Sequence, residues 1–142
     1  MGILSALSRK TISIQEIIEQ AGFYLSPQIK VLEERNESYE QLLGQEAIYY
    51  MLCVTQEVAS RDINEEEFGM LLIYLMGKER AYTLIKTYLL TKEHKMVHNK
   101  FINDLRPIAI SDIKNGMIAS SNFLIEHFEA GQQAAQDIYN SQ

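Results

Sequence analysis

The chain of 142 residues is 46% hydrophobic and 23% charged, with a net charge of −6 and a single cysteine. This length suffices for one domain with its own hydrophobic core, and one cysteine excludes an internal disulfide. The negative charge argues against nucleic-acid binding. The longest apolar run, at 68–77, has about half of the ~20 residues that a membrane-spanning helix needs. We therefore expect a cytoplasmic protein without a membrane partner.

Helical signals dominate the first sixty residues. The stretch SIQE at 13–16 is a capping-box pattern, and Gly22 is a natural end for the helix that it begins. Ser26 and Pro27 then suit the cap and the first position of the next helix. An apolar stripe continues to about residue 60, but the polar residues around Asn36 leave open whether 27–60 is one helix or two.

The next helix is expected to begin at NEEE, residues 64–67, with Asn64 as its cap and three glutamates that favour the positive end of the helix dipole. Its apolar face ends at Gly77. A basic helix is then expected from about residue 78 to about residue 106, where Pro107 disfavours continuation.

Ser111 is expected to cap a last helix that extends to about residue 130, with Ile113, Met117, Leu124 and Phe128 on one side. The sequence therefore predicts an all-α fold. We expect a single compact bundle-like domain of five or six helices, mostly antiparallel, over residues 1–131. Residues 132–142 are polar and are expected to form a frayed tail.

The charges are unevenly distributed along the chain. Residues 13–67 carry twelve acidic side chains and three basic ones, whereas residues 76–106 carry seven basic side chains and three acidic ones. In one interpretation, acidic and basic helices pack beside each other and partly neutralise. In the other, the acidic half presents a surface to a basic partner.

Two of the three histidines, His94 and His98, are spaced four residues apart in the stretch EHKMVH. On a helix through this segment, both lie in the middle of an apolar stripe, so their nitrogens need partners. Three interpretations remain open. A neighbouring helix satisfies them, they bind a metal ion together with Glu126 or His127, or the stripe is a partner interface.

Catalytic motifs are not found in the sequence. The HExxH glutamate, the Gly-x-Ser-x-Gly elbow and the phosphate-binding glycine motifs do not occur, and Cys53 lies in an apolar run that disfavours a reactive thiolate. We therefore do not expect an enzyme.

Tyrosines on the helices expected at 45–60 and 65–76 point beyond the main core stripe. Tyr49 and Tyr50 lie on different sides of their helix, and Tyr74 lies off the line of core residues in the next one. A second apolar face fits self-association or a partner groove. The alternative is that both helices are central and buried nearly all round.

We therefore expect a non-catalytic protein-binding module that needs no cofactor. A specific version is a small acidic bacterial inhibitor or immunity-type protein that masks a basic partner surface, and a homodimer is the other arrangement considered. The residues expected to contact the partner are Glu33, Glu34, Glu37, Glu40, Tyr49, Glu57 and Tyr74. The alternative function is a metal- or cofactor-binding helical bundle that uses the His94/His98 pair.

Overall fold

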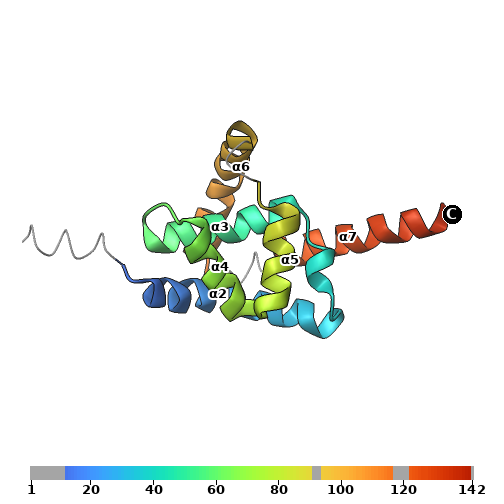
Figure 1. The fold of residues 1–142 in the computed structure, drawn as a ribbon, viewed down its shortest axis with the longest axis horizontal. Helices are drawn as coiled ribbons and strands as arrows, with labels where there is room; N and C mark the ends of the chain where they lie inside the picture. Colours follow the sequence, from blue (N-terminus) through green and yellow to red (C-terminus); the bar gives the residue numbers. More distant parts are fainter. Residues whose placement is uncertain (1–11, 91–93, 117–121, 142) are drawn as a thin grey trace, which may run out of the picture.

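The computed structural model describes residues 12–90, 94–116 and 122–141. The helices, shown in Figure 1, are α2 (Ile14–Arg35), the short 3-10 helix η1 (Tyr39–Gln41), α3 (Gln45–Ala59), α4 (Glu65–Met76), α5 (Lys78–Tyr88), α6 (Lys95–Lys114) and α7 (Asn122–Asn140). The described residues include no strand. The all-α prediction is confirmed, because these helices pack into one compact domain.

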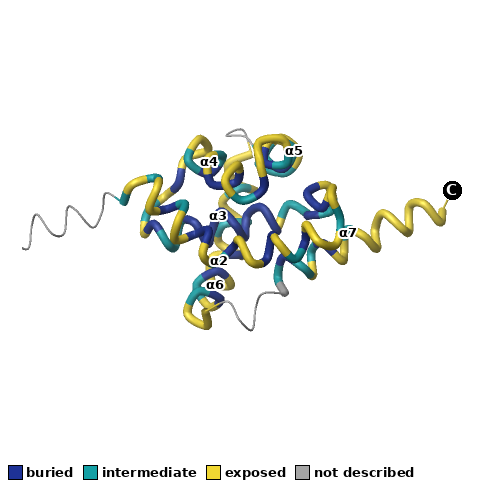
Figure 2. The backbone as a smooth tube through the Cα atoms, turned by 90° about the horizontal axis from the view of Figure 1, so that it is seen from below, coloured by how far each residue is buried: buried dark blue, intermediate teal, exposed yellow. Residues whose placement is uncertain are grey.

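Helix α3 lies at the centre of the domain, as the buried tube in Figure 2 shows. Every residue from 47 to 55 is buried, and α2, α5, α6 and α7 all contact this helix. The hydroxyl of Thr55 donates a hydrogen bond of 2.7 Å to the carbonyl of Met51 and so stays satisfied inside the core. A helix that is surrounded on all sides must be apolar on all sides, which explains the run AIYYMLCV.

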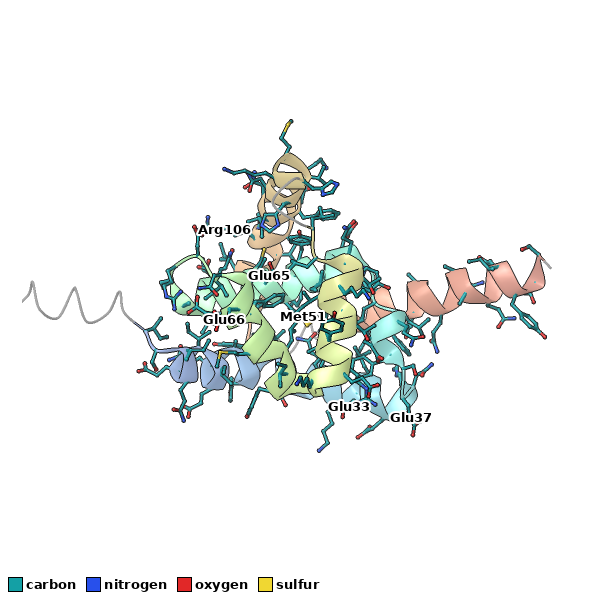
Figure 3. All side chains as sticks on the ribbon, in the orientation of Figure 1. Glu33, Glu37, Met51, Glu65, Glu66 and Arg106 are labelled. Atoms are coloured by element: carbon teal, nitrogen blue, oxygen red, sulfur yellow. The ribbon has the colours of Figure 1, made fainter. Side chains whose placement is uncertain are left out.

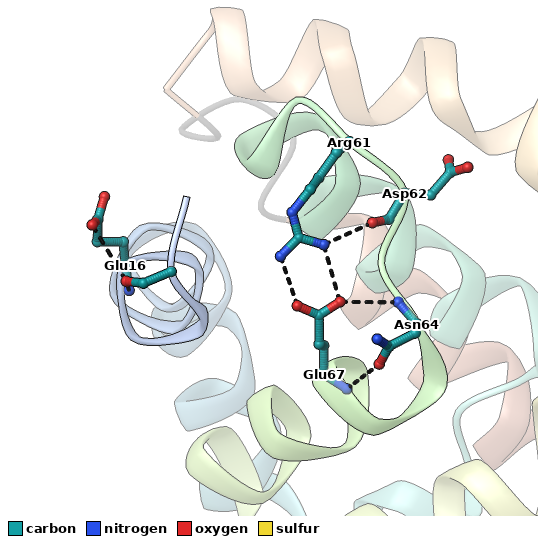
Figure 4. Close-up of polar contacts among 6 residues, drawn as sticks. Glu16, Arg61, Asp62, Asn64 and Glu67 are labelled. Carbon is teal, nitrogen blue, oxygen red and sulfur yellow. Dashed lines mark hydrogen bonds and ion pairs between the residues drawn. The ribbon is translucent and has the colours of Figure 1, made fainter. Parts of the chain in front are cut away.

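Two helix starts and one helix end occur where the sequence predicts them. The Ser13 hydroxyl accepts a hydrogen bond of 3.2 Å from the amide of Glu16. Asn64 and Glu67 form a reciprocal capping box, in which each side chain accepts from the amide of the other (Figure 4). Gly77, with a φ of 90°, separates α4 from α5.

Helix α2 continues through Gly22 and Pro27, so the predicted end at Gly22 and the restart at Ser26 and Pro27 are wrong. A Cβ added at Gly22 would lie 3.1 Å from Cε1 of Tyr74, so this glycine serves the close crossing of α2 and α4. Pro27 is exposed, and water can reach the carbonyl that loses its amide partner there. The chain leaves the helix at Asn36, so residues 27–60 contain the end of α2, the short helix η1 and all of α3.

The basic segment forms two helices instead of the single one predicted over residues 78–106. Helix α5 ends at Tyr88, and α6 continues through Pro107, so Ser111 lies inside α6 and does not begin a new helix. Packing of α6 against α3 outweighs the local cost of the proline, because it buries Leu105 and Ala109. Met117, predicted to face the core, lies outside the described residues.

Helix α7 joins the domain through its first half. Leu124 and Phe128 are buried, as predicted, and Glu129 forms a 3.0 Å ion pair with Arg35 of α2. The segment predicted as a polar tail is helical through residue 140, is exposed, and extends away from the body (Figure 1). Across the described ranges, no helix is long and apolar enough to cross a membrane.

Candidate functional site

His98 forms a hydrogen bond with a buried tyrosine of the core, Tyr49. The Tyr49 hydroxyl lies 2.8 Å from Nδ1 of His98, and it accepts a 3.1 Å hydrogen bond from the amide of Leu90. The Tyr49 ring also stacks on Phe101, with 4.9 Å between the ring centroids. Burial raises the pKa of Tyr49, against the opposing effect of the Leu90 amide. The hydrogen bond from Tyr49 of α3 agrees with the interpretation that a neighbouring helix satisfies the imidazole of His98.

The prediction that both histidines lie inside an apolar stripe is wrong for His94. This residue precedes α6 and is exposed, because α6 begins at Lys95 and is not a continuation of α5. The first turn of α6 stands out from the domain, and Met96 is 87% exposed. His98 is one turn further along and half-buried, so the two side chains have different surroundings.

A metal site at His94 and His98 finds no ligand cluster in the described ranges. Within them, no group of three or more His, Cys, Asp and Glu side chains is close enough to hold an ion. His127, considered as a third ligand, lies 3.6 Å from the carboxylate of Glu46 instead, and Glu126 is exposed on α7.

Three of the acidic residues predicted to contact a partner lie next to arginines of the basic segment. Arg80 of α5 lies 3.7 Å from the carboxylates of both Glu33 and Glu40, and Glu40 is buried. Arg106 of α6 lies 3.8 Å from the carboxylate of Glu57. Acidic and basic helices therefore do pack beside each other, as the first interpretation of the charge distribution expects.

The other predicted contact residues divide between core and surface. Tyr49 is fully buried, so helix α3 has no free second face. Glu34 and Glu37 are exposed at the end of α2, where Figure 3 labels Glu37, and a role for them in partner binding stays a prediction. Tyr74 is 63% exposed on the outside of α4.

Tyr74 belongs to a group of exposed apolar side chains that we call the outer apolar face. Three of its members, spaced i, i+3 and i+4, share the side of α4 that faces away from buried Phe68 and Leu72. Exposure of the five side chains ranges from 45% to 75%. The face consists of Phe23 of α2, Met70, Ile73 and Tyr74 of α4, and Tyr82 of α5.

Helix α2 extends this face on one side. The Tyr74 ring lies over Gly22, where an added Cβ would be 3.1 Å from its Cε1 atom. Phe23 is the next residue of α2, and the absence of a side chain at Gly22 leaves room for the Tyr74 ring there.

Helix α5 extends the face on the other side. A Cβ at Gly69 would lie 3.6 Å from Cδ1 of Ile85, so α4 and α5 run antiparallel on either side of Gly77. This hairpin brings Tyr82 to about the level of Ile73. Figure 1 shows the two helices side by side.

The residues expected to contact a partner did not include Phe23, Met70, Ile73 or Tyr82, although a second apolar face was one interpretation of the helix expected at 65–76. Met70 and Ile73 lie in the continuous apolar run FGMLLIYLM, in which periodicity cannot distinguish the buried side from the exposed side. Phe23 stands next to Gly22, which was interpreted as a helix end. Comparisons with protein-family models, curated proteins and solved structures found no match for the chain.

Proposed function

We propose that the protein is a non-catalytic binding module that docks a partner protein on its outer apolar face. The observation that carries the proposal is the exposure of five large apolar side chains on three adjoining helices. Single exposed apolar residues are common, whereas a contiguous group is typical of an interaction surface. Tyrosine, phenylalanine and methionine are also enriched at protein interfaces.

The charges around this face support a partner with a basic edge. Glu19 precedes Phe23 by one helical turn, and Glu66 precedes Met70 by one turn; both are exposed, and Figure 3 labels Glu66. Lys78 is exposed at the start of α5, just after α4 ends and the chain turns at Gly77. A partner that places basic side chains beside Glu19 and Glu66, and apolar side chains between them and Lys78, matches this pattern.

This chemistry fits the more specific hypothesis of a small acidic bacterial inhibitor or immunity-type protein that acts in the cytoplasm. Such a protein would mask a basic surface on its partner. The proposed contact differs from the one inferred from the sequence, because it is centred on α4 instead of the acidic residues at 33–57. Tyr74 is common to both.

Affinity capture with matched variants tests the proposal. Wild type, the double variant Phe23→Gln/Ile73→Gln and the control Met96→Gln are compared as baits in lysate of the source cell, and the captured protein is then titrated in purified form. Phe23 and Ile73 are exposed, so the double variant should unfold at nearly the wild-type temperature. We expect it to bind the partner about thirtyfold or more weakly, since central apolar contacts dominate interface energies. Met96→Gln changes an exposed side chain on α6 and should bind like wild type.

Equal binding by wild type and the Phe23→Gln/Ile73→Gln variant would overturn the proposed face. Sedimentation of the purified chain tests the homodimer. A wild-type dimer that the same double variant converts to a monomer would identify a second copy of the chain, instead of a basic partner, as the occupant.

A further inference from the structure

A cleft of about 530 Å³ opens beside His98, between α3, the start of α4, the end of α5 and the start of α6. Its apolar wall includes Leu52, Phe68 and Leu90, and its polar residues include Lys95, His98 and Asn99. Small-molecule sites typically measure roughly 300–1,000 Å³ and combine mostly apolar walls with a few placed polar groups. We call this feature the His98 cleft. None of its lining residues belongs to the outer apolar face.

The hydrogen bond with Tyr49 orients the His98 ring at the cleft. The Tyr49 hydroxyl accepts from the Leu90 amide, so its single proton is available for Nδ1 of His98, 2.8 Å away. When Nδ1 accepts this proton, the hydrogen of the imidazole ring is on Nε2. In that tautomer, Nε2 can donate a hydrogen bond to a ligand in the cleft that His98 lines.

Two further donors accompany this imidazole on α6. Lys95, His98 and Asn99 are spaced i, i+3 and i+4, which places them in one group on the helix surface. An ammonium, an imidazole N–H and an amide NH₂ in one group suit an anionic head with several acceptor oxygens. Glu65 lines the α4 side of the cleft and disfavours a second anionic group there.

We propose that the His98 cleft binds a small amphipathic carboxylate. The carboxylate accepts hydrogen bonds from the donor group of α6, and the apolar chain of the ligand lies against the partly exposed side chains of Leu89 and Leu90. The burial of that chain supplies most of the binding free energy, and the head group sets the orientation.

Calorimetric titration of the full chain with three probes tests the ligand class. Decanoate has both an anionic head and an apolar chain, butyrate has the head with a short chain, and decyltrimethylammonium has the chain with a cationic head. All are used below the concentrations at which they form micelles. We expect one decanoate per chain, with butyrate and decyltrimethylammonium at least tenfold weaker. Absence of decanoate binding, or equal binding of the cationic probe, would overturn the proposal.

Variants at exposed positions test the location. Lys95→Ala removes one charged donor and should weaken decanoate roughly tenfold. Asn99→Trp fills the cleft from its edge and should abolish binding. Lys100→Ala, on the same helix but absent from the cleft lining, should bind decanoate like wild type. Circular dichroism and thermal unfolding check that each variant is folded.

Unchanged affinity in both Lys95→Ala and Asn99→Trp would overturn the assignment to the cleft. The Phe23→Gln/Ile73→Gln variant should keep its decanoate binding. If this variant lost the probe, decanoate would be bound at the outer apolar face and not beside His98, and the cleft proposal would fail whatever the outcome for the protein partner.

Discussion

The hydroxyl of Tyr50 donates a hydrogen bond of 2.6 Å to the carboxylate of Asp112, between the central helix α3 and the helix α6 that packs along it. Both side chains are buried, with Tyr50 fully enclosed and Asp112 3% exposed. Burial and, after it, the hydrogen bond to Asp112 raise the pKa of Tyr50 well above its ordinary value. The hydroxyl therefore keeps its proton at neutral pH and remains a donor to the buried carboxylate.

Removal of the Tyr50 hydroxyl should destabilise the domain, although the substitution takes away only one oxygen atom. Tyr50→Phe leaves a buried carboxylate without this donor, and we expect the free energy of unfolding to fall by about 1–3 kcal/mol. Urea denaturation at pH 7 measures the change. Tyr139→Phe is the matched control, because Tyr139 is 74% exposed on α7 and should change stability by less than about 0.5 kcal/mol.

A double variant separates the cost of the unpaired carboxylate from the loss of packing. Tyr50→Phe/Asp112→Leu removes both polar partners. Its loss in the free energy of unfolding should be smaller than the sum of the losses of the two single variants. Additive losses would show that the hydrogen bond between Tyr50 and Asp112 does not couple the two side chains.

Helix caps and the overall class were predictable from the sequence because their signals are local. Ser13 and Asn64 bond amides within their own helices, and Gly77 provides a backbone conformation that other residues rarely adopt. The interior prolines misled the prediction for the opposite reason. Helices α2 and α6 continue through Pro27 and Pro107 because their flanking residues are buried against other helices, and local sequence does not report that packing.

The candidate sites were less predictable because they depend on contacts between distant segments. The partner of His98 is Tyr49, forty-nine positions earlier, and no spacing rule connects them. Burial of Glu40 beside Arg80 likewise follows from the packing of η1 against α5. The spacing of His94 and His98 predicted the same environment for both side chains only because one helix was assumed across 78–106.

The single thiol should be nearly unreactive in the folded protein. Cys53 is 1% exposed on α3, and burial raises the pKa of its thiol to about 12. At pH 8, the thiolate fraction should then be on the order of a thousandfold lower than in the unfolded chain, whose thiol has a pKa near ~8.5. The rate of reaction with a chromogenic disulfide reagent, with and without denaturing urea, tests this protection, and burial of the sulfur should slow the folded protein further. Since the chain has one cysteine, the signal has one source. Comparable rates in the two conditions would contradict burial of Cys53.

A glycine on α7 should be intolerant of any side chain. A Cβ at Gly131 would lie 1.9 Å from the carbonyl oxygen of Leu42, a backbone atom that cannot rotate away. Gly131→Ala should therefore displace α7 and lower the free energy of unfolding by about 1–3 kcal/mol, despite the better helix propensity of alanine. Thermal and urea unfolding measure the loss.

The matched control for this substitution is Gly69→Ala on α4. There an added Cβ would meet Cδ1 of Ile85 at 3.6 Å, an ordinary contact, so the variant should be neutral or stabilised by up to about 1 kcal/mol. If Gly131→Ala were as stable as wild type, or shared a stabilisation with Gly69→Ala, the close approach of α7 to Leu42 would be wrong.

The capping box of α4 should contribute a pH-dependent part of the stability. Glu67 accepts two hydrogen bonds from the guanidinium of Arg61, at 2.6 and 3.0 Å, as Figure 4 shows. The Arg61 guanidinium holds the pKa of Glu67 below its usual value, with a smaller contribution from the Asn64 amide. A lowered folded pKa favours the charged form. The stabilisation is therefore fully present above the unfolded pKa of about 4.3 and is lost as the pH falls through the folded value.

Glu67→Gln tests this directly, because glutamine can still close the capping box but carries no charge. At pH 7 the variant should be less stable than wild type by about 1 kcal/mol, since the ion pair is partly exposed. The difference should shrink as the pH falls below the unfolded pKa of about 4.3 and through the lowered folded pKa of Glu67, because the wild-type carboxylate then becomes protonated. Asp104→Asn, which removes a well-exposed ion pair with Lys100, should cost less than about 0.5 kcal/mol at pH 7. A Glu67→Gln effect that stays constant as the pH falls would contradict a contribution from the charge of Glu67.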